Sequence, residues 1–137
     1  MRNAAKLLIV LSLIIVGLIA TSCGAIPGAK ECDAVVNSFM KAAAAKDVDG
    51  AYACMCSRAA TREDVESFVQ NRYDLFQGFQ EVKMRGVEVH YSETEGDTAE
   101  YQGEAEYSRD FATWVEAELI KEGDKWKIWG ITITPSE

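Results

Sequence analysis

Beyond residue 30, apolar residues recur first with the spacing of helices and then with the spacing of strands. Between residues 31 and 46 they fall at i, i+3, i+4 and i+7, which predicts a helix with one buried face. A shorter helix is expected from about residue 47 to residue 57. Thr61 predicts the start of a third helix that ends at Gly78, because Thr61 is a good N-cap and Asp64 stands three residues later, as in a capping box.

Apolar and polar residues alternate from Gly78 to Pro135, and a period of two is typical of strands. The alternation falls into four segments, which cover residues 81–94, 98–107, 111–119 and 125–134. Gly86 lies where the first segment changes phase, so we expect a β-bulge there. Four antiparallel strands with one apolar face, preceded by three helices that cover this face, make an α+β domain.

The faces of the strands limit how they pair, because directly paired residues point to the same side of a sheet. A three-residue loop after the second strand pairs Tyr101 with Ala117. The apolar positions change parity in the fourth strand, so the last hairpin needs an even loop. A loop at residues 122–123 makes Glu118 face Lys127 as an exposed ion pair.

The beginning of the chain has the pattern of an export signal. Two basic residues precede a long uncharged apolar run, which predicts a signal peptide over residues 1–22. The small residues before Cys23 resemble a bacterial lipobox, in which a peptidase cuts before the cysteine and the cysteine carries lipid. We therefore expect residues 23–30 to tether a domain of residues 31–137 to the extracytoplasmic side of a bacterial cell membrane. An uncut membrane anchor and plain secretion are the alternatives, and both also place the domain outside the cytoplasm.

The chain is acidic, with 14 basic residues against 22 acidic ones and a net charge of −8. Such a surface repels phosphate backbones, so nucleic acid is not expected as a partner. The lipid on Cys23 must then hold the protein to the membrane without help from positive charge.

Three cysteines follow the anchor, at Cys32, Cys54 and Cys56. We interpret them as buried apolar residues. The alternatives are a disulfide between Cys32 and one of the others, and a soft-metal site at the Cys-Met-Cys sequence. No metal site and no other cofactor are predicted.

Two segments resemble the nuclear-transport-factor-2-like superfamily, which includes SnoaL-like and ketosteroid-isomerase-like proteins. Residues 39–52 are similar to its opening helix pair, and residues 123–131 are similar to its final strand. The resemblance extends over residues 31–134 and is strongest to small extracytoplasmic members of uncharacterised function. It implies a strongly curved, conical sheet wrapped on three helices, a pocket for a small apolar ligand in some members, and a dimer in many. Since the same fold hosts enzymes and non-catalytic modules, it does not select a function.

Hydroxyl groups are the polar groups that we expect on the inner face of the sheet. The candidate ligand-pocket residues are Tyr91, Tyr101, Tyr107 and Thr113, and core packing is their alternative role. The inner positions of the first three strands carry no charged residue, whereas acid–base catalysis needs a titratable group near the substrate. His90 is the one histidine of the chain and is expected on the outer face, opposite Glu100. We therefore predict no catalytic residue, and a SnoaL-like enzyme that uses the cone is the alternative.

Two tryptophans, Trp114 and Trp129, are expected on the outer face among acidic residues. Ile131 and Ile133 join them unless Gly130 resets the phase of the strand as a bulge. Such a surface indicates a docking site or a homodimer interface, unless a helix or the curvature of the sheet covers it. The sequence therefore predicts a non-catalytic domain that binds a small apolar ligand or a protein partner at the cell envelope.

Overall fold

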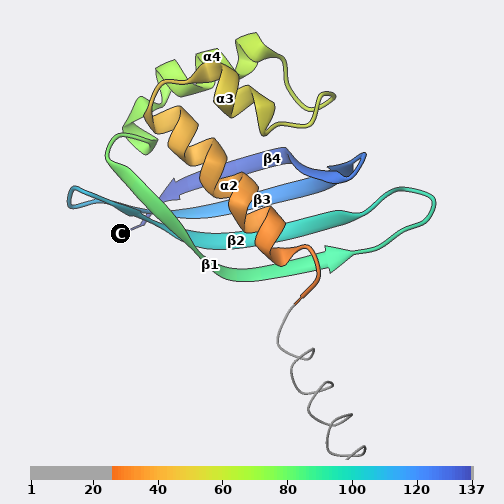
Figure 1. Ribbon diagram of the computed structural model, residues 1–137. Coiled ribbons are helices and arrows are strands. Elements are labelled where there is room, and N and C mark those ends of the chain that lie inside the picture. The colour runs from red at the N-terminus through yellow and green to blue at the C-terminus, as the bar shows by residue number, and fades with distance from the viewer. Residues whose placement is uncertain (1–25, 137) are drawn as a thin grey trace, which may run out of the picture.

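The structure is a computed structural model that describes residues 26–136. A layer of helices covers one face of an antiparallel sheet (Figure 1), which confirms the α+β prediction. The elements are α2 (Ala29–Ala44), α3 (Val48–Ala53), α4 (Arg62–Asn71), the 3₁₀ turn η1 (Tyr73–Leu75), β1 (Phe79–His90), β2 (Thr98–Tyr107), β3 (Ala112–Glu122) and β4 (Lys125–Pro135). The predicted signal peptide and the lipidation site at Cys23 lie outside the described residues.

The second helix is shorter than the sequence predicts. Asp47 caps α3 by accepting a hydrogen bond from the Gly50 backbone N–H at 3.0 Å. The helix ends at Ala53 because the next residues pair with β4: the Cys56 N–H donates to the Ile128 carbonyl at 2.8 Å, and the Ile128 N–H donates to the Cys54 carbonyl at 2.8 Å. Both cysteines therefore follow the helix, and the expectation that they lie on it is wrong.

The third helix begins with the predicted capping box. The Thr61 hydroxyl accepts from the Asp64 backbone N–H at 3.2 Å, and the Asp64 carboxylate accepts from the Thr61 N–H at 3.0 Å. α4 ends at Asn71, earlier than predicted, and η1 carries the chain on toward Gly78, whose φ of +82° suits a residue without a side chain.

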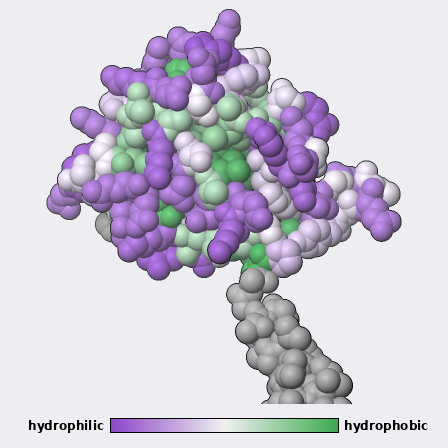
Figure 2. Space-filling view, in the orientation of Figure 1, coloured by the Kyte–Doolittle hydropathy of each residue, from purple (hydrophilic) through white to green (hydrophobic). Residues whose placement is uncertain are grey.

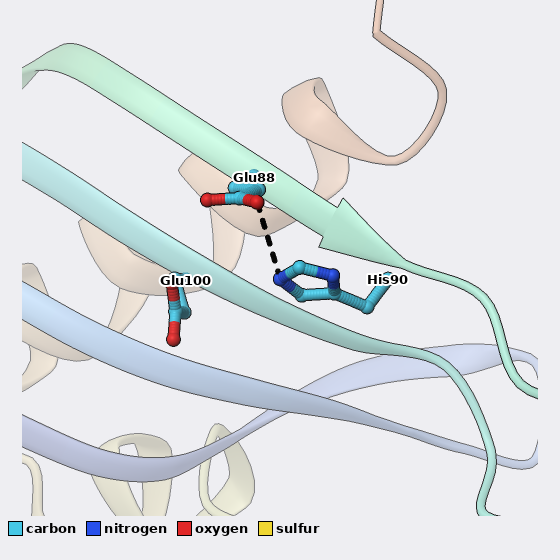
Figure 3. Close-up of side chains that lie close together, drawn as sticks. All are labelled: Glu88, His90 and Glu100. Carbon is cyan, nitrogen blue, oxygen red and sulfur yellow. Dashed lines mark ion pairs between the residues drawn. The ribbon is translucent and has the colours of Figure 1, made fainter.

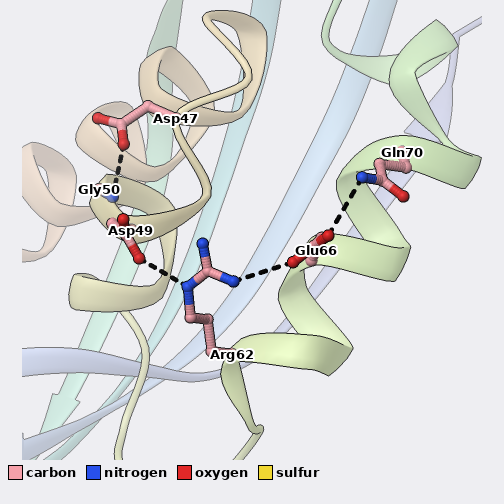
Figure 4. A network of polar contacts seen from close by, with 6 residues as sticks. All are labelled: Asp47, Asp49, Gly50, Arg62, Glu66 and Gln70. Carbon is pink, nitrogen blue, oxygen red and sulfur yellow. Dashed lines mark hydrogen bonds and ion pairs between the residues drawn. The ribbon is translucent and has the colours of Figure 1, made fainter.

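A polar network joins α3 to α4 on the solvent side (Figure 4). The Arg62 guanidinium donates to the Asp49 carboxylate at 2.7 Å and to the Glu66 carboxylate at 2.9 Å. Gln70 adds a hydrogen bond to Glu66 at 3.3 Å. These side chains are exposed, so the network sets the orientation of the two helices more than it adds stability.

The sheet has the order β1-β2-β3-β4, and all neighbours are antiparallel. Tyr101 pairs with Ala117, as predicted. The register of β1 against β2 shifts between Met84 and Gly86, which confirms a bulge at this point. Because β1 ends at His90, the predicted extension of this strand to residue 94 is wrong.

The last hairpin has an even loop of two residues, Gly123 and Asp124, as its parity required, but the loop lies one residue later than predicted. The predicted pair of Glu118 with Lys127 is wrong. Lys127 pairs with Ile120, and its ammonium donates to the Ala53 carbonyl at 2.5 Å.

A bulge in β4 explains why its later residues pair differently from a regular strand. The register changes between Glu118 and Leu119, which leaves Trp129 as the extra residue of the opposite strand. The phase of β4 is thereby reset, and Ile131 and Ile133 turn to the inner face, opposite Ala117 and Val115. The alternative with a bulge near Gly130 is the correct one.

The core lies between α2 and the concave side of the sheet, and side chains fill it. Phe39 and Phe76 meet edge to face at 6.2 Å between ring centroids, with Phe39 1 % exposed and Phe76 fully buried. Strand β2 approaches β1 closely at Gly103, where an added Cβ would lie 2.5 Å from Val82 Cγ1. The neighbouring residues of β1 and β2 therefore leave no space for a larger side chain at this position.

Candidate functional site

Three of the four predicted pocket residues lie inside the domain, and their hydroxyl groups bond to the protein itself. The Tyr101 hydroxyl donates to Asp33 Oδ1 at 2.6 Å. The Tyr107 hydroxyl donates to the Leu75 carbonyl at 2.6 Å and lies 3.0 Å from the Thr113 hydroxyl. Because each of these groups already has a partner, the interior is a packed core held by specific hydrogen bonds.

Tyr91, the fourth predicted pocket residue, is on the surface. Its side chain is 61 % exposed, and its hydroxyl donates to the Pro27 carbonyl at 3.1 Å. The prediction that Tyr91 faces inward is wrong because β1 ends at His90, so the alternation of faces does not extend to the next residue.

A polar pair on α2 faces the sheet, and the sequence reasoning missed it. Asn37 accepts from the Val82 N–H at 2.8 Å, donates to the Val82 carbonyl at 3.3 Å, and also donates to Asp33 Oδ1 at 3.2 Å. Burial, and then the hydrogen bond to Asp33, raises the pKa of Tyr101 far above its usual value. The i, i+4 spacing of Asp33 and Asn37 beside the apolar stripe of the helix was the feature of the sequence that could have predicted this pair. Asp33 is thus a carboxylate near the interior, and it ties the helix to β2.

On the outer face, three glutamates form one row across three strands. Glu88 pairs with Glu100, and Glu100 pairs with Glu118. Like charges directly opposite each other destabilise a sheet. At the other end of β2 two acids have basic partners, since Glu104 lies 3.1 Å from Arg85 and Glu106 lies 3.0 Å from Lys83, although Glu106 also pairs with Glu81. We call Glu88, Glu100 and Glu118 the acidic row.

His90 lies beside the acidic row on the exposed side of β1, as predicted (Figure 3). Its Nε2 is 3.5 Å from the Glu88 carboxylate. Its paired residue is Thr98 rather than the predicted Glu100, because the β1–β2 connection spans residues 91–97. The histidine nevertheless lies close to Glu100, as the ligand atoms of Glu88, His90 and Glu100 all lie within 4.8 Å of one another.

Imidazole nitrogen and carboxylate oxygen are ligands that divalent cations accept. All three side chains of this cluster are exposed, however, and exposed acidic groups commonly lie close together without a bound ion. We interpret the cluster as part of an acidic surface, and the absence of a metal site stays a prediction.

A depression of about 500 Å³ adjoins the acidic row. Its lining combines charge with apolar surface: His90, Glu95, Glu100, Glu118, Ile120 and Trp129 contribute, together with Arg58. The Trp129 side chain is 44 % exposed, and the Arg58 guanidinium lies 5.8 Å from its ring centroid. An aromatic ring beside carboxylates suits a cationic group, which both can attract.

The two tryptophans predicted for a partner surface do not belong to the same site. Trp129 lies on the outer face, as predicted, and lines the depression. Trp114 is half-buried, pairs with Glu104 and Thr134, and donates its indole N–H to Glu116 at 3.1 Å. Trp129 is therefore the tryptophan that borders the depression, and the Arg58 guanidinium lies over its ring.

The cysteines of the described chain are free. Burial and the nearby Glu31 carboxylate raise the pKa of Cys32 to about 11, and burial likewise raises the pKa of Cys54. The Cys54 thiol donates to the Gly50 carbonyl at 3.5 Å, and the Cys56 thiol donates to the Glu122 carboxylate at 3.0 Å. Cys32 and Cys56 are buried, in agreement with the favoured interpretation, whereas Cys54 is half-buried, and no disulfide joins the three.

No protein-family model matches the chain, and no curated protein sequence matches it either. Solved structures do resemble it. A protein of unknown function with a cystatin-like fold from Nostoc punctiforme superposes with a TM-score of 0.58 at 15 % identity, over 77 % of this chain and 89 % of its own. The chain has a cystatin-like fold.

Two further structures share this fold. Aln2 from a Streptomyces species superposes with a TM-score of 0.58 at 13 % identity and covers 81 % of this chain and 93 % of its own. A variant of Rv3472, a protein of unknown function from Mycobacterium tuberculosis, superposes with a TM-score of 0.55 at 12 % identity and covers 78 % of this chain and 75 % of its own. The predicted resemblance to the nuclear-transport-factor-2-like superfamily is thus confirmed as a likeness of fold, and the identities are too low to carry a function across.

Among the described residues, no helix has the length and apolar character that crossing a membrane requires. The segment that bears on anchoring precedes residue 26.

Proposed function

We propose that this chain is a lipid-anchored, non-catalytic domain on the extracytoplasmic side of a bacterial cell membrane, where it binds a basic segment of a protein partner. Its sequence supports the anchor through the signal-peptide pattern and the lipobox-like residues before Cys23. The observation that supports the binding role is the acidic row, whose glutamates occupy directly paired positions and form no ion pair with lysine or arginine among the described residues.

Charge and shape both favour a basic partner. A Lys or Arg side chain placed over the acidic row relieves the repulsion between directly paired glutamates, and it lies near the exposed part of the Trp129 ring, over which Arg58 already shows that a guanidinium can lie. The net charge of −8 draws such a partner from a distance. The depression then provides apolar contact through Ile120 and Trp129.

A small apolar ligand in the cone is the less favoured form of binding. The inward residues expected to line its pocket are 0–8 % exposed, with Tyr101, Tyr107 and Thr113 already bonded to protein groups. A ligand would have to displace core side chains, whose removal costs about 2–5 kcal/mol for each large apolar group. Binding at the outer face needs no such change.

The test places a photo-crosslinking amino acid at position 129 of the full chain in its bacterial host. We expect crosslinks to a protein whose contact region is basic, and we expect Glu100→Lys to abolish them. Glu63→Lys is the matched control, because Glu63 is an exposed acid on α4, away from the sheet. Crosslinks that survive Glu100→Lys, or that disappear equally with Glu63→Lys, would contradict a role for the acidic row.

The anchor is tested separately by the mass of the N-terminal peptide. A diacylglyceryl group on Cys23 is expected, and Cys23→Ala should leave the signal peptide uncut. A mature chain that starts elsewhere without lipid would contradict the anchor and would leave the test of the acidic row intact.

A further inference from the structure

A second surface feature lies at the end of the domain where the anchor begins. Four large apolar side chains are strongly exposed in the described chain: Ile26 at 52 %, Met84 at 40 %, Tyr91 at 61 % and Trp129 at 44 %. Three of them gather around the start of α2. Figure 2 shows hydrophobic surface beside the point where the chain leaves toward its N-terminus.

Contacts join these residues into one surface. Ile26, Met84 and the half-buried Val87 line a single open groove with residues 27–31, and the groove has a volume of about 450 Å³. Tyr91 closes one side, since its hydroxyl donates to the Pro27 carbonyl at 3.1 Å. We call Ile26, Met84, Val87 and Tyr91 the apolar patch.

The short tether determines what can lie against this patch. Three peptide units separate Cys23 from Ile26, and each spans at most about 3.6 Å, so the two Cα atoms are no more than about 11 Å apart. A lipid chain on Cys23 inserts into the bilayer, which holds Ile26 at the depth of the headgroups. An uncut apolar anchor over residues 7–29 would deliver the same end of the domain to the same depth.

We propose that the apolar patch rests in the membrane interface and fixes the orientation of the domain on the bilayer. The occupant of the groove is the boundary between headgroups and acyl chains. Ile26, Met84 and Val87 supply apolar area, and Tyr91 supplies an aromatic body with a polar tip, a combination that favours this boundary. The rim is electrically balanced, because Lys30 and Glu31 both border the groove, so the contact suits a zwitterionic surface. This inference rests on the proposed anchor.

The proposed orientation of the domain on the bilayer also determines where the acidic row and the depression lie relative to the membrane. β1 carries Met84 and leads into Tyr91 beside the membrane, while the depression extends across the sheet to Trp129 on β4, the opposite edge. The acidic row runs from the membrane-side edge strand into the sheet. A basic partner would therefore approach along the membrane surface rather than from far above it.

The test uses hydroxyl-radical labelling of the full chain in phosphatidylcholine vesicles, read by peptide mass spectrometry. The labelling of Tyr91 is divided by that of Trp129 in the same sample. A flexible insert of about 20 Gly and Ser residues after Ala25 removes the restraint of the short tether, so any remaining protection reports the affinity of the patch itself. In this long-tether background, the double variant Ile26→Glu/Met84→Glu is compared with the control Trp129→Glu, which changes a similarly exposed apolar residue outside the patch. Because Trp129 is absent from the control, the labelling of Tyr91 in these two variants is divided by that of Trp114 instead.

We expect Tyr91 to be labelled at least fivefold less in the parent than in the long-tether Ile26→Glu/Met84→Glu variant. The same difference is expected between the unsubstituted long-tether chain and that variant. Trp129→Glu should leave the labelling of Tyr91 unchanged. All the substituted side chains are exposed, and circular dichroism checks that each variant is folded. Equal labelling of Tyr91 in the parent and the double variant, with both chains floating with the vesicles, would overturn the patch alone. A parent chain that fails to float with the vesicles would overturn the anchor and, with it, the patch.

Discussion

The close approach of β1 and β2 makes Gly103 the position where the smallest change should cost the most. An added Cβ lies 2.5 Å from Val82 Cγ1, 3.0 Å from the Lys83 carbonyl oxygen and 3.2 Å from Tyr101 Cε1. Real Cβ atoms keep more than 3 Å from their neighbours, and one of these neighbours is backbone. Gly103→Ala therefore requires the two strands to move apart or Val82 to leave its site.

The expected cost follows from two opposing effects. Overpacking a filled core costs about 1–3 kcal/mol. Replacing glycine inside a strand returns about 0.5–1 kcal/mol, because the unfolded chain loses freedom. The net expectation is a loss of about 1–2 kcal/mol, which for a domain of this size lowers Tm by roughly 4–9 °C.

Gly86→Ala is the matched control. Gly86 also lies in the β1–β2 ladder, but nothing stands within 4 Å of its added Cβ and its φ is not positive. It should leave stability unchanged or raise it slightly. The assay is urea unfolding of the purified chain, followed by tryptophan fluorescence.

A double-mutant cycle locates the clash. Val82→Ala alone leaves a cavity and destabilises, but combined with Gly103→Ala it removes the contact at 2.5 Å, so the double variant should lose less than the sum of the single variants. Equal effects of Gly103→Ala and Gly86→Ala, or strict additivity with Val82→Ala, would refute the packing derived for this part of the sheet.

Tyr107→Phe should cost about 1–2 kcal/mol in urea unfolding, since it leaves the buried Leu75 carbonyl without this donor, whereas Tyr91→Phe, at an exposed hydroxyl, should cost close to nothing. The raised pKa of Cys32 means that the unfolded thiol ionises first, near pH 9, while the folded thiol holds its proton to about pH 11. The contribution of the Cys32 thiol to the free energy of unfolding is thus complete below pH 9 and is lost as the pH rises from 9 to 11. In Cys32→Ala, the urea midpoint should fall less over this pH range. Glu100→Gln should raise stability by about 0.2–1 kcal/mol at low salt by relieving the acidic row, whereas Glu104→Gln, which removes the ion pair with Arg85, should not; the same sign for both would contradict the unpaired state of the row.

The periodicity of apolar residues predicted most of the helices and strands, because each of them must bury one face. The alternation of Ala99, Tyr101, Gly103, Ala105 and Tyr107 predicted the inner face of β2, and all five residues are buried. It also predicted the pairing of β2 with β3, since parity and a short loop together leave few registers.

The features that sequence patterns missed depend on contacts between distant residues. α3 stops at Ala53 because the next residues pair with β4, a partner more than seventy residues away. The extra residue at Trp129 has no local marker except the neighbouring glycine, and it decides which face Ile131 and Ile133 occupy. The local sequence gives no sign that Asp33 faces the interior, because its partner, the Tyr101 hydroxyl at 2.6 Å, comes from the distant strand β2.

The two ends of the sheet treat charge in opposite ways. At the Arg85 end, Glu106 pairs with Glu81, but Lys83 and Arg85 on β1 reach Glu106 and Glu104 on β2 and offset this repulsion. At the His90 end, Glu100 directly opposes both Glu88 and Glu118, although a lysine at position 100 would have paired with both. An arrangement that costs stability at one end and not at the other is expected where a surface serves binding. This end also adjoins the depression and the partly exposed ring of Trp129, so the cost falls at the surface where the proposed basic partner would offset it.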